Sequence, residues 1–204
     1  MHSRRSNLVI LAWLLLAGAL LAQNRQPRPA NSYAQPLGIP LSTIILFGDQ
    51  YNGGDELYDV KITVAELARG EKAWQMVKAA GAENPAPVAG LEYLLARVKF
   101  EFAARNRPAH YDYTLDPSQF SAMSAATVPY AAANLAAPVK PELRATLHSG
   151  DSAEGWVAFV VPRGDHTPLM IFREDVGSVI HQGDASIFRL YHDHSAATAK
   201  TKTP

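Results

Sequence analysis

Hydrophobic and polar residues alternate along two stretches of the chain, and this period of two predicts strands with one buried and one solvated face. The clearer stretch covers residues 94–102, and the other covers residues 58–65. Shorter apolar runs at 44–47, 168–172 and 186–190 predict three further strands. Clusters of Gly, Pro, Asn and Asp separate these runs and favour turns between them.

Two other stretches depart from this alternation. Residues 156–161 are apolar at every position, which predicts a central strand covered on both faces. Residues 70–80 place Ala73, Trp74 and Val77 at helical spacing and predict a short amphipathic helix. A helix this short is marginal alone, so we expect Trp74 to pack against the sheet.

The pattern as a whole predicts a mainly β protein. Residues 122–141 hold eight alanines and three prolines, and the prolines interrupt every long run. This segment therefore predicts a long crossing loop with at most one helical turn. Many short strands with one short helix predict an antiparallel β-sandwich of two sheets. The paired cysteines that mark antibody domains are absent from the sequence.

The N-terminus carries the pattern of a secretory signal peptide. Arg4 and Arg5 precede an uncharged apolar run of 15 residues, 8–22, with small residues late in the run. We expect cleavage after Ala22, and hence a periplasmic or extracellular location. The run is shorter than the ~20 residues of a typical spanning helix. The alternative is an uncleaved signal anchor, because tilt and bilayer thinning accommodate short helices.

The chain beyond residues 1–22 divides into three predicted parts. Residues 23–36 carry three prolines and no apolar periodicity, and they predict an extended linker. Residues 37–191 hold the predicted strands and helix, and they form the β-sandwich domain. Residues 192–204 are small and polar, which predicts a disordered tail.

Composition narrows the classes of function that remain. The chain has 204 residues with 19 basic and 19 acidic side chains, and signal cleavage leaves 17 basic and 19 acidic ones, a net charge of −2. This balance argues against nucleic-acid binding, which needs a basic face. The lack of cysteine excludes a disulfide framework, a cysteine nucleophile, a cysteine zinc site and a thiol-linked lipid anchor. A chain of this length can bury a core without such supports.

Three stretches together resemble a known family. They are Arg-Gly-Glu-Lys-Ala-Trp at 69–74, Asn-Pro-Ala-Pro at 84–87 followed by Gly-Leu-Glu-Tyr-Leu at 90–94, and Glu-Gly-Trp-Val-Ala-Phe at 154–159. Their order and spacing resemble exported bacterial domains of unknown function with an immunoglobulin-like fold. That family is related in structure to a secreted mycobacterial immunoprotective antigen.

The resemblance covers residues 37–191 and implies an immunoglobulin-like β-sandwich presented at the cell surface or in the medium. It implies no catalytic residues, because none are established for the family. Members are often lipid-anchored through a cysteine after the signal. This chain has no cysteine, so release or periplasmic residence is expected instead.

Two groups of residues could hold a metal ion. His192, Asp193 and His194 offer imidazole and carboxylate ligands that suit Zn²⁺ or Cu²⁺, although a solvated tail is the simpler interpretation. Asp49, Asp55 and their acidic neighbours could bind Ca²⁺ weakly. The spacing does not match an EF-hand, and Asn-Gly-Gly-Asp is also ordinary turn chemistry. No resident cofactor is predicted.

Tyr111 and Tyr113 are the candidate recognition residues, because tyrosine gives contact area at low entropic cost. They lie in the polar stretch 109–117, and the alternative is that they are tucked against the edge of the sandwich. The sequence contains neither a G-x-S-x-G nor an H-E-x-x-H motif, so no catalytic residue is assigned.

The sequence therefore predicts an exported, non-enzymatic β-sandwich that binds a protein or an envelope component through its loops. It predicts no nucleic-acid partner and membrane contact only through an uncleaved signal segment. A metal-binding exported protein and a structural role on a signal anchor remain as alternatives.

Overall fold

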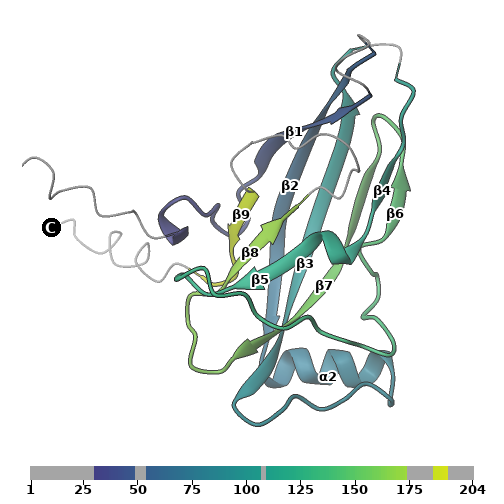
Figure 1. Cartoon of the computed structure of the whole chain (residues 1–204). Helices are drawn as coiled ribbons and strands as arrows, with labels where there is room; N and C mark the ends of the chain where they lie inside the picture. The colour runs from purple at the N-terminus through teal and green to yellow at the C-terminus, as the bar shows by residue number, and fades with distance from the viewer. Residues whose placement is uncertain (1–29, 49–53, 107–108, 174–185, 193–204) are drawn as a thin grey trace, which may run out of the picture.

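The computed structural model describes residues 30–48, 54–106, 109–173 and 186–192. This part of the chain is mainly β, with nine strands, one α-helix and two short 3₁₀ helices (Figure 1). The strands are β1 (Leu41–Phe47), β2 (Glu56–Arg69), β3 (Leu91–Ala104), β4 (Tyr113–Leu115), β5 (Phe120–Met123), β6 (Ala145–Leu147), β7 (Ser152–Pro162), β8 (Leu169–Phe172) and β9 (Ser186–Arg189). The helices are η1 (Ala30–Ser32), α2 (Glu71–Ala80) and η2 (Pro117–Gln119).

The strands form two layers. One layer is a four-stranded antiparallel sheet in the order β1-β2-β3-β7. The other layer consists of the β4-β6 pair and the β5-β8-β9 sheet, which are also antiparallel. Side chains from both layers meet in one core, which includes Val60, Phe100, Tyr113, Phe172 and Phe188. The predicted mainly β architecture, an antiparallel β-sandwich with one short helix, is confirmed.

The two longest strands, β2 and β3, follow the predicted alternation. Val60 and Ile62 on β2 are buried and pair with Phe102 and Phe100 on β3. A register shift follows residue 64, and the pairing then continues to the end of β2. Both strands are longer than the alternating stretches that predict them, because regular pairing continues past the clean alternation.

The helix α2 lies over one end of the four-stranded sheet, where it packs against β2 and β3 (Figure 1). Its buried residues Ala73 and Val77 belong to a second apolar cluster that also includes Trp156. The ring of Trp74 stacks on the ring of Tyr93, with the two centroids 6.0 Å apart. The predicted helix and the expected packing of Trp74 against the sheet are confirmed.

Strand β7 is covered on both faces, as predicted, but it is not central. It is the last strand in the order of its sheet. Val157 and Phe159 face the core between the layers, whereas Trp156 belongs to the cluster beneath α2. The predicted central position is therefore wrong. An apolar run on both faces does not require a central strand, because a helix and a long loop can bury a strand that has one sheet neighbour.

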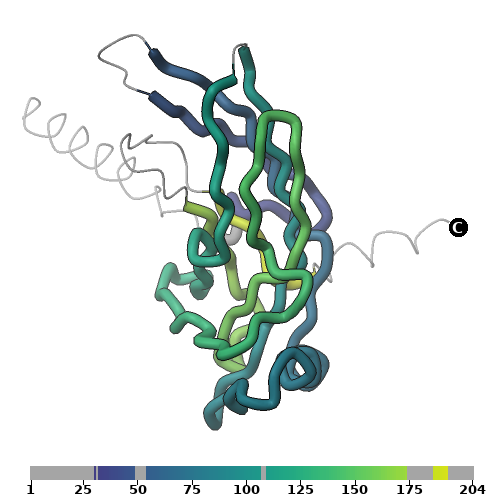
Figure 2. Tube along the Cα trace, turned by 90° about the vertical axis from the view of Figure 1, so that its right-hand side faces the viewer, coloured from purple at the N-terminus to yellow at the C-terminus, as the bar shows by residue number. Residues whose placement is uncertain are grey.

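Residues 124–143, called the strap below, contain no helical turn and cross from the second layer to the free edge of β7 (Figure 1). Ala132 forms a bridge with Phe159, and Glu142 forms one with Trp156. The predicted crossing loop, residues 122–141, is confirmed, except that residues 122 and 123 belong to β5. Figure 2 shows β6 and β7, joined by a turn, facing the viewer and α2 at the lower end of the molecule.

Residues 30–36 belong to the predicted linker, and they contact the second layer. Ala34 is buried, and the N–H of Gln35 donates to the carbonyl oxygen of Ile187 at 2.8 Å. The folded part therefore includes residues before position 37. The predicted signal peptide, residues 1–22, lies outside the described residues. Within the described ranges, no helix is long and apolar enough to cross a membrane.

Candidate functional site

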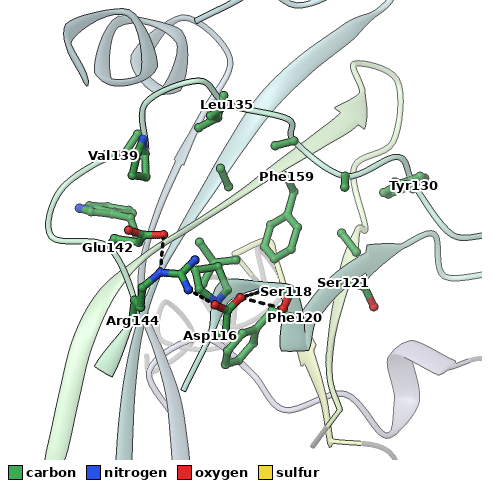
Figure 3. A pocket seen from close by; sticks show the side chains of 18 of the residues that line it. Asp116, Ser118, Phe120, Ser121, Tyr130, Leu135, Val139, Glu142, Arg144 and Phe159 are labelled. Atoms are coloured by element: carbon green, nitrogen blue, oxygen red, sulfur yellow. Dashed lines mark hydrogen bonds and ion pairs between the residues drawn. The ribbon is translucent and has the colours of Figure 1, made fainter. Parts of the chain in front are cut away.

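A pocket of about 440 Å³ lies between the strap, the η2–β5 segment and residues 156–159 of β7 (Figure 3). Its walls are mostly apolar, and one end is charged. The larger apolar side chains of the lining are Phe120, Leu135, Val139, Trp156 and Phe159, and small alanines supply much of the remainder. This strap pocket is lined by residues of both layers, from β5 in one and β7 in the other.

The charged end of the strap pocket holds one guanidinium between two carboxylates (Figure 3). Arg144 donates through Nη1 to Asp116 and through Nε to Oε1 of Glu142, the latter at 3.3 Å. Lys140 is mostly exposed, and its Nζ lies 3.4 Å from Oε2 of Glu142. The side chains of Asp116 and Glu142 are 27% and 17% exposed, whereas that of Arg144 is 57% exposed.

Local sequence fixes the position of Asp116, which is the N-cap of η2. Its Oδ1 accepts hydrogen bonds from the N–H of Ser118 at 2.8 Å and from the Ser118 hydroxyl at 2.7 Å. Gln119 completes a capping box by accepting from the Asp116 N–H at 3.0 Å. Burial opposes ionisation of Asp116, but the Ser118 hydrogen bonds and the charge of Arg144 outweigh it and lower the pKa of Asp116.

Asn84 ties the strap to α2. Its buried side-chain amide donates to the carbonyl oxygens of Val77 and Ala137, each at 2.8 Å. The amide oxygen accepts from the Ala137 N–H at 2.9 Å. One side chain therefore satisfies three backbone groups, two of them on the strap.

Gly155 allows the strap to approach β7 closely. A Cβ atom at this position would lie 2.5 Å from the backbone carbon of Glu142 and from the backbone nitrogen of Leu143. Next to it, the N–H of Trp156 donates to the carbonyl oxygen of Pro141 at 2.7 Å. A larger residue at 155 would therefore push away the part of the strap that carries Glu142 into the pocket.

A third contact holds the strap at its other end, where the Tyr130 hydroxyl donates to Asp165. Burial first, and this hydrogen bond second, raise the pKa of Tyr130. Arg69 in turn donates to the Asp165 carbonyl oxygen at 2.5 Å and to Glu92 at 2.6 Å. The wall of the strap pocket is therefore held in place at both ends.

These contacts explain the three sequence stretches that carry the family resemblance. Arg69 lies in the first stretch, Asn84 and Glu92 in the second, and Gly155 in the third. Asn84 bonds the strap and Gly155 leaves space for it, whereas Arg69 and Glu92 hold Asp165, which bonds Tyr130 of the strap. Each of the three stretches therefore contributes to the folding of this segment.

Tyr113 is 2% exposed, which corrects the expectation that it offers an exposed ring to a partner. It lies on β4, and its ring stacks on Phe100 with centroids 5.3 Å apart. Tyr111 is 38% exposed and stacks on Phe47 with centroids 5.1 Å apart. Tyr113 and Leu115 are both buried and alternate with Thr114, so a short period of two was the signal that could have revealed β4.

Two carboxylate–histidine pairs hold the segment that leads into β4. Glu56 accepts from the backbone N–H of His110 at 2.9 Å and from the Tyr58 hydroxyl at 2.7 Å, and it also contacts the His110 ring. The His110 backbone bond and the Tyr58 bond lower the pKa of Glu56 to about 2. The Asp112 carboxylate lies 2.6 Å from Nδ1 of His148, and their hydrogen bond raises the pKa of His148.

Of the predicted metal ligands, the structure places Asp55 and His192, both exposed, whereas Asp49, Asp193 and His194 lie outside the described residues. In the part of the chain that the structure describes, no three His, Asp or Glu side chains are grouped to hold a metal ion. Asp59, on β2, is paired with Arg105. Metal binding therefore stays a prediction.

No protein-family model matches this sequence, and no curated protein sequence matches it. Two solved structures are similar in outline. The candidate lipoprotein YcdA from Bacillus subtilis has a TM-score of 0.49 and 11% identity, over 69% of this chain and 38% of that chain. The secreted protein MPT63 from Mycobacterium tuberculosis has a TM-score of 0.40 and 14% identity, over 72% of this chain and 92% of that chain.

Neither likeness is close enough to assign a function to this chain. The chain also spans well under two thirds of the length of YcdA. The exported family that the sequence resembles therefore stays a prediction, and the β-sandwich rests on the sheets of this chain itself.

Proposed function

We propose that this chain is an exported, non-enzymatic β-sandwich that acts as a binding module at the cell envelope or in the medium. Its binding site is the strap pocket. The observation that carries the proposal is the combination of a cavity of about 440 Å³, apolar with one charged end, with a wall that is anchored at both ends.

The size and lining of the strap pocket support a binding role. Ligand pockets in proteins are typically about 300–1,000 Å³, mainly apolar, with a few polar groups that orient the ligand. The anchored strap supports a site that exists before the ligand arrives, which reduces the entropic cost of binding. Export is supported by Arg4, Arg5 and the apolar run that follows them.

The chemistry of the charged end supports binding rather than catalysis. A general acid or base works best when its pKa lies near the working pH. Asp116 has a lowered pKa and is held by Ser118 and Arg144, so it is a poor proton donor or acceptor at neutral pH. A panel of hydrolase substrates tests this point, and turnover that one pocket substitution abolishes would overturn the non-enzymatic role.

Export is tested by N-terminal sequencing of the protein recovered from envelope and medium fractions. We expect a chain that begins at Gln23, because cleavage is expected after Ala22. Recovery only in membranes with residues 1–22 still attached would support the signal-anchor alternative.

Binding is tested by crosslinked affinity capture from intact cells, with identification by mass spectrometry. Ala132→Trp places a bulky ring in the strap pocket, and Ala136→Trp makes the same change on the exposed strap outside the lining. We expect a captured component that is lost with Ala132→Trp and kept with Ala136→Trp. Equal capture by both variants would move the binding site away from the strap pocket.

A further inference from the structure

We propose that the strap pocket takes an organic cation, namely a primary ammonium group carried on an apolar body. This inference rests on the proposed function, because it names the ligand class of the same site. It follows from the shape and the charge of the pocket, taken in turn below.

The apolar part of the pocket is suited to a hydrocarbon body. Phe120, Leu135, Val139 and Phe159 line it together with several alanines. Apolar surface gains by leaving water for such a lining, whereas a fully polar ligand would lose its hydration without replacement. The ligand therefore has an apolar portion that lies against these side chains.

The charged end of the pocket favours a cation. Its lining includes two carboxylates, Asp116 and Glu142, and one guanidinium, Arg144. The carboxylates are 27% and 17% exposed, whereas the guanidinium is 57% exposed and reaches solvent. Arg144 and the 72% exposed Lys140 already balance the two carboxylates in charge. Both of these cations are more exposed than the carboxylates, so a cation that enters the pocket meets the carboxylates on their buried side.

The hydrogen bonds at this end leave room for an ammonium group. An ionised carboxylate offers about four acceptor positions. Asp116 accepts from Ser118 and Arg144, and Glu142 accepts from Arg144 and Lys140. Both carboxylates keep acceptor capacity, and an ammonium group brings three donors and no acceptor.

An anionic ligand is the competing possibility, because Arg144 could also bind a carboxylate. Such a ligand would bring a third negative charge next to Asp116 and Glu142, and the repulsion is costly in a partly desolvated site. The guanidinium is also already engaged by both carboxylates. The burial of the carboxylates, with Arg144 and Lys140 toward solvent, therefore favours the ammonium group.

Three probes with one apolar body separate these possibilities: octylammonium, 1-octanol and octanoate. Calorimetry at pH 7 measures their binding to the mature chain, to Ala132→Trp and to Ala136→Trp. We expect octylammonium to bind at least about tenfold more tightly than octanoate, with 1-octanol between them. We expect Ala132→Trp to abolish binding of all three probes and Ala136→Trp to leave it unchanged.

The role of charge is tested by Glu142→Gln, which keeps the shape of the side chain. The matched control is Glu154→Gln, which removes a carboxylate on β7 that is paired with Arg97 outside the pocket lining. We expect Glu142→Gln to weaken octylammonium binding several-fold, to leave 1-octanol unchanged and to strengthen octanoate. Thermal unfolding of each variant confirms that the fold is retained.

The outcomes distinguish the ligand class from the site itself. Equal affinity for the three probes, lost with Ala132→Trp, would overturn the ammonium class and keep the binding pocket. Preference for octanoate would replace the cation with an anion held by Arg144. Both proposals would be overturned by two results together. In these, Ala132→Trp removes no probe binding, and the component captured from cells is the same with and without this substitution.

Discussion

At the scale of single residues, the strap pocket depends on side chains that lie outside its lining. Asn84 holds the strap by three hydrogen bonds, and Gly155 leaves the space through which the strap passes. Neither side chain lines the pocket, and both residues belong to the three stretches that carry the sequence resemblance. Both residues matter because they determine where the backbone of the strap lies, although the strap is distant from them in the sequence.

Substitution of Gly155 by alanine tests this dependence on space. The added Cβ would lie 2.5 Å from the backbone at Glu142 and Leu143, so the strap must move. We expect a loss of about 1–3 kcal/mol in the free energy of unfolding, measured with urea. Gly164→Ala is the matched control, because its Cβ would have no neighbour within 4 Å. Equal stability of the two variants would contradict the close approach of the strap.

The two tyrosines of the 109–117 stretch make a second comparison. Tyr113 is 2% exposed and stacks on Phe100, so Tyr113→Ala is expected to cost about 3–5 kcal/mol of unfolding free energy. Tyr111 is 38% exposed, so Tyr111→Ala is expected to cost less than about 1 kcal/mol. Denaturant unfolding measures both. A stable Tyr113→Ala protein that loses its captured partner would restore Tyr113 as a recognition residue.

At the scale of elements, the strap, α2 and β7 depend on one another. The helix covers one face of the sheet, the strap covers the edge of β7, and Asn84 joins the helix to the strap. Such a short helix gains most of its stability from packing. Loss of the joint is therefore expected to loosen both the helix and the wall of the pocket.

Asn84→Ala measures this coupling. It leaves the carbonyl oxygen of Val77 and two backbone groups of Ala137 without their partner, which is expected to cost about 2–4 kcal/mol of unfolding free energy. Hydrogen exchange should rise in α2 and in the strap together. Asn134→Ala, at an exposed position of the strap, is the control and should change neither. Faster exchange in the strap alone would mean that the helix is stable without it.

The elements that the sequence predicts are the ones with long or strongly apolar patterns. β2, β3 and α2 were found because eight or more residues carry each signal, and β7 was found because six consecutive residues are apolar. β4, β5 and β6 were missed, because they have three or four residues each and lie in polar or alanine-rich surroundings. Their strand character comes from pairing with distant segments rather than from their own sequence.

The strap pocket could not be predicted from the sequence for a related reason. Its lining comes from three separate regions, around residues 116–122, 130–144 and 156–159. Nothing in the local pattern of any one region shows that it meets the other two. The alanines at 131–133, which by themselves favour a helix, line a cavity because small side chains leave space there.

At the scale of the whole molecule, contacts between the layers lie at both ends of the sandwich. The strap and α2 lie at one end (Figure 1). Toward the other, Glu56 on the first layer holds His110 and, through Tyr58, the N–H of Tyr111, from which the chain enters β4 of the second layer. Ionised Glu56 therefore helps to join the two layers.

The contribution of Glu56 to joining the layers should appear in the pH dependence of the free energy of unfolding. The pKa of Glu56 in the folded state is about 2, below the ordinary value of 4.5. Ionised Glu56 therefore stabilises the fold above pH 4.5, and this contribution is lost as the pH falls from 4.5 to about 2. The urea midpoint of Glu56→Gln should lie below that of the wild type at pH 7 and match it at pH 2. The exposed Glu83→Gln serves as control, and a difference that persists at pH 2 would contradict this assignment.

The position of the strap has a further consequence, for self-association. An unpaired strand at the end of a sheet can recruit a strand from another molecule and begin aggregation. In this chain the free edge of β7 is already bonded to the strap at Trp156 and Phe159. The strap itself carries Pro129, Pro138 and Pro141, which have no N–H to offer to a further strand. The segment that shapes the pocket thus also terminates the sheet, and it protects this edge where many copies of the chain fold side by side.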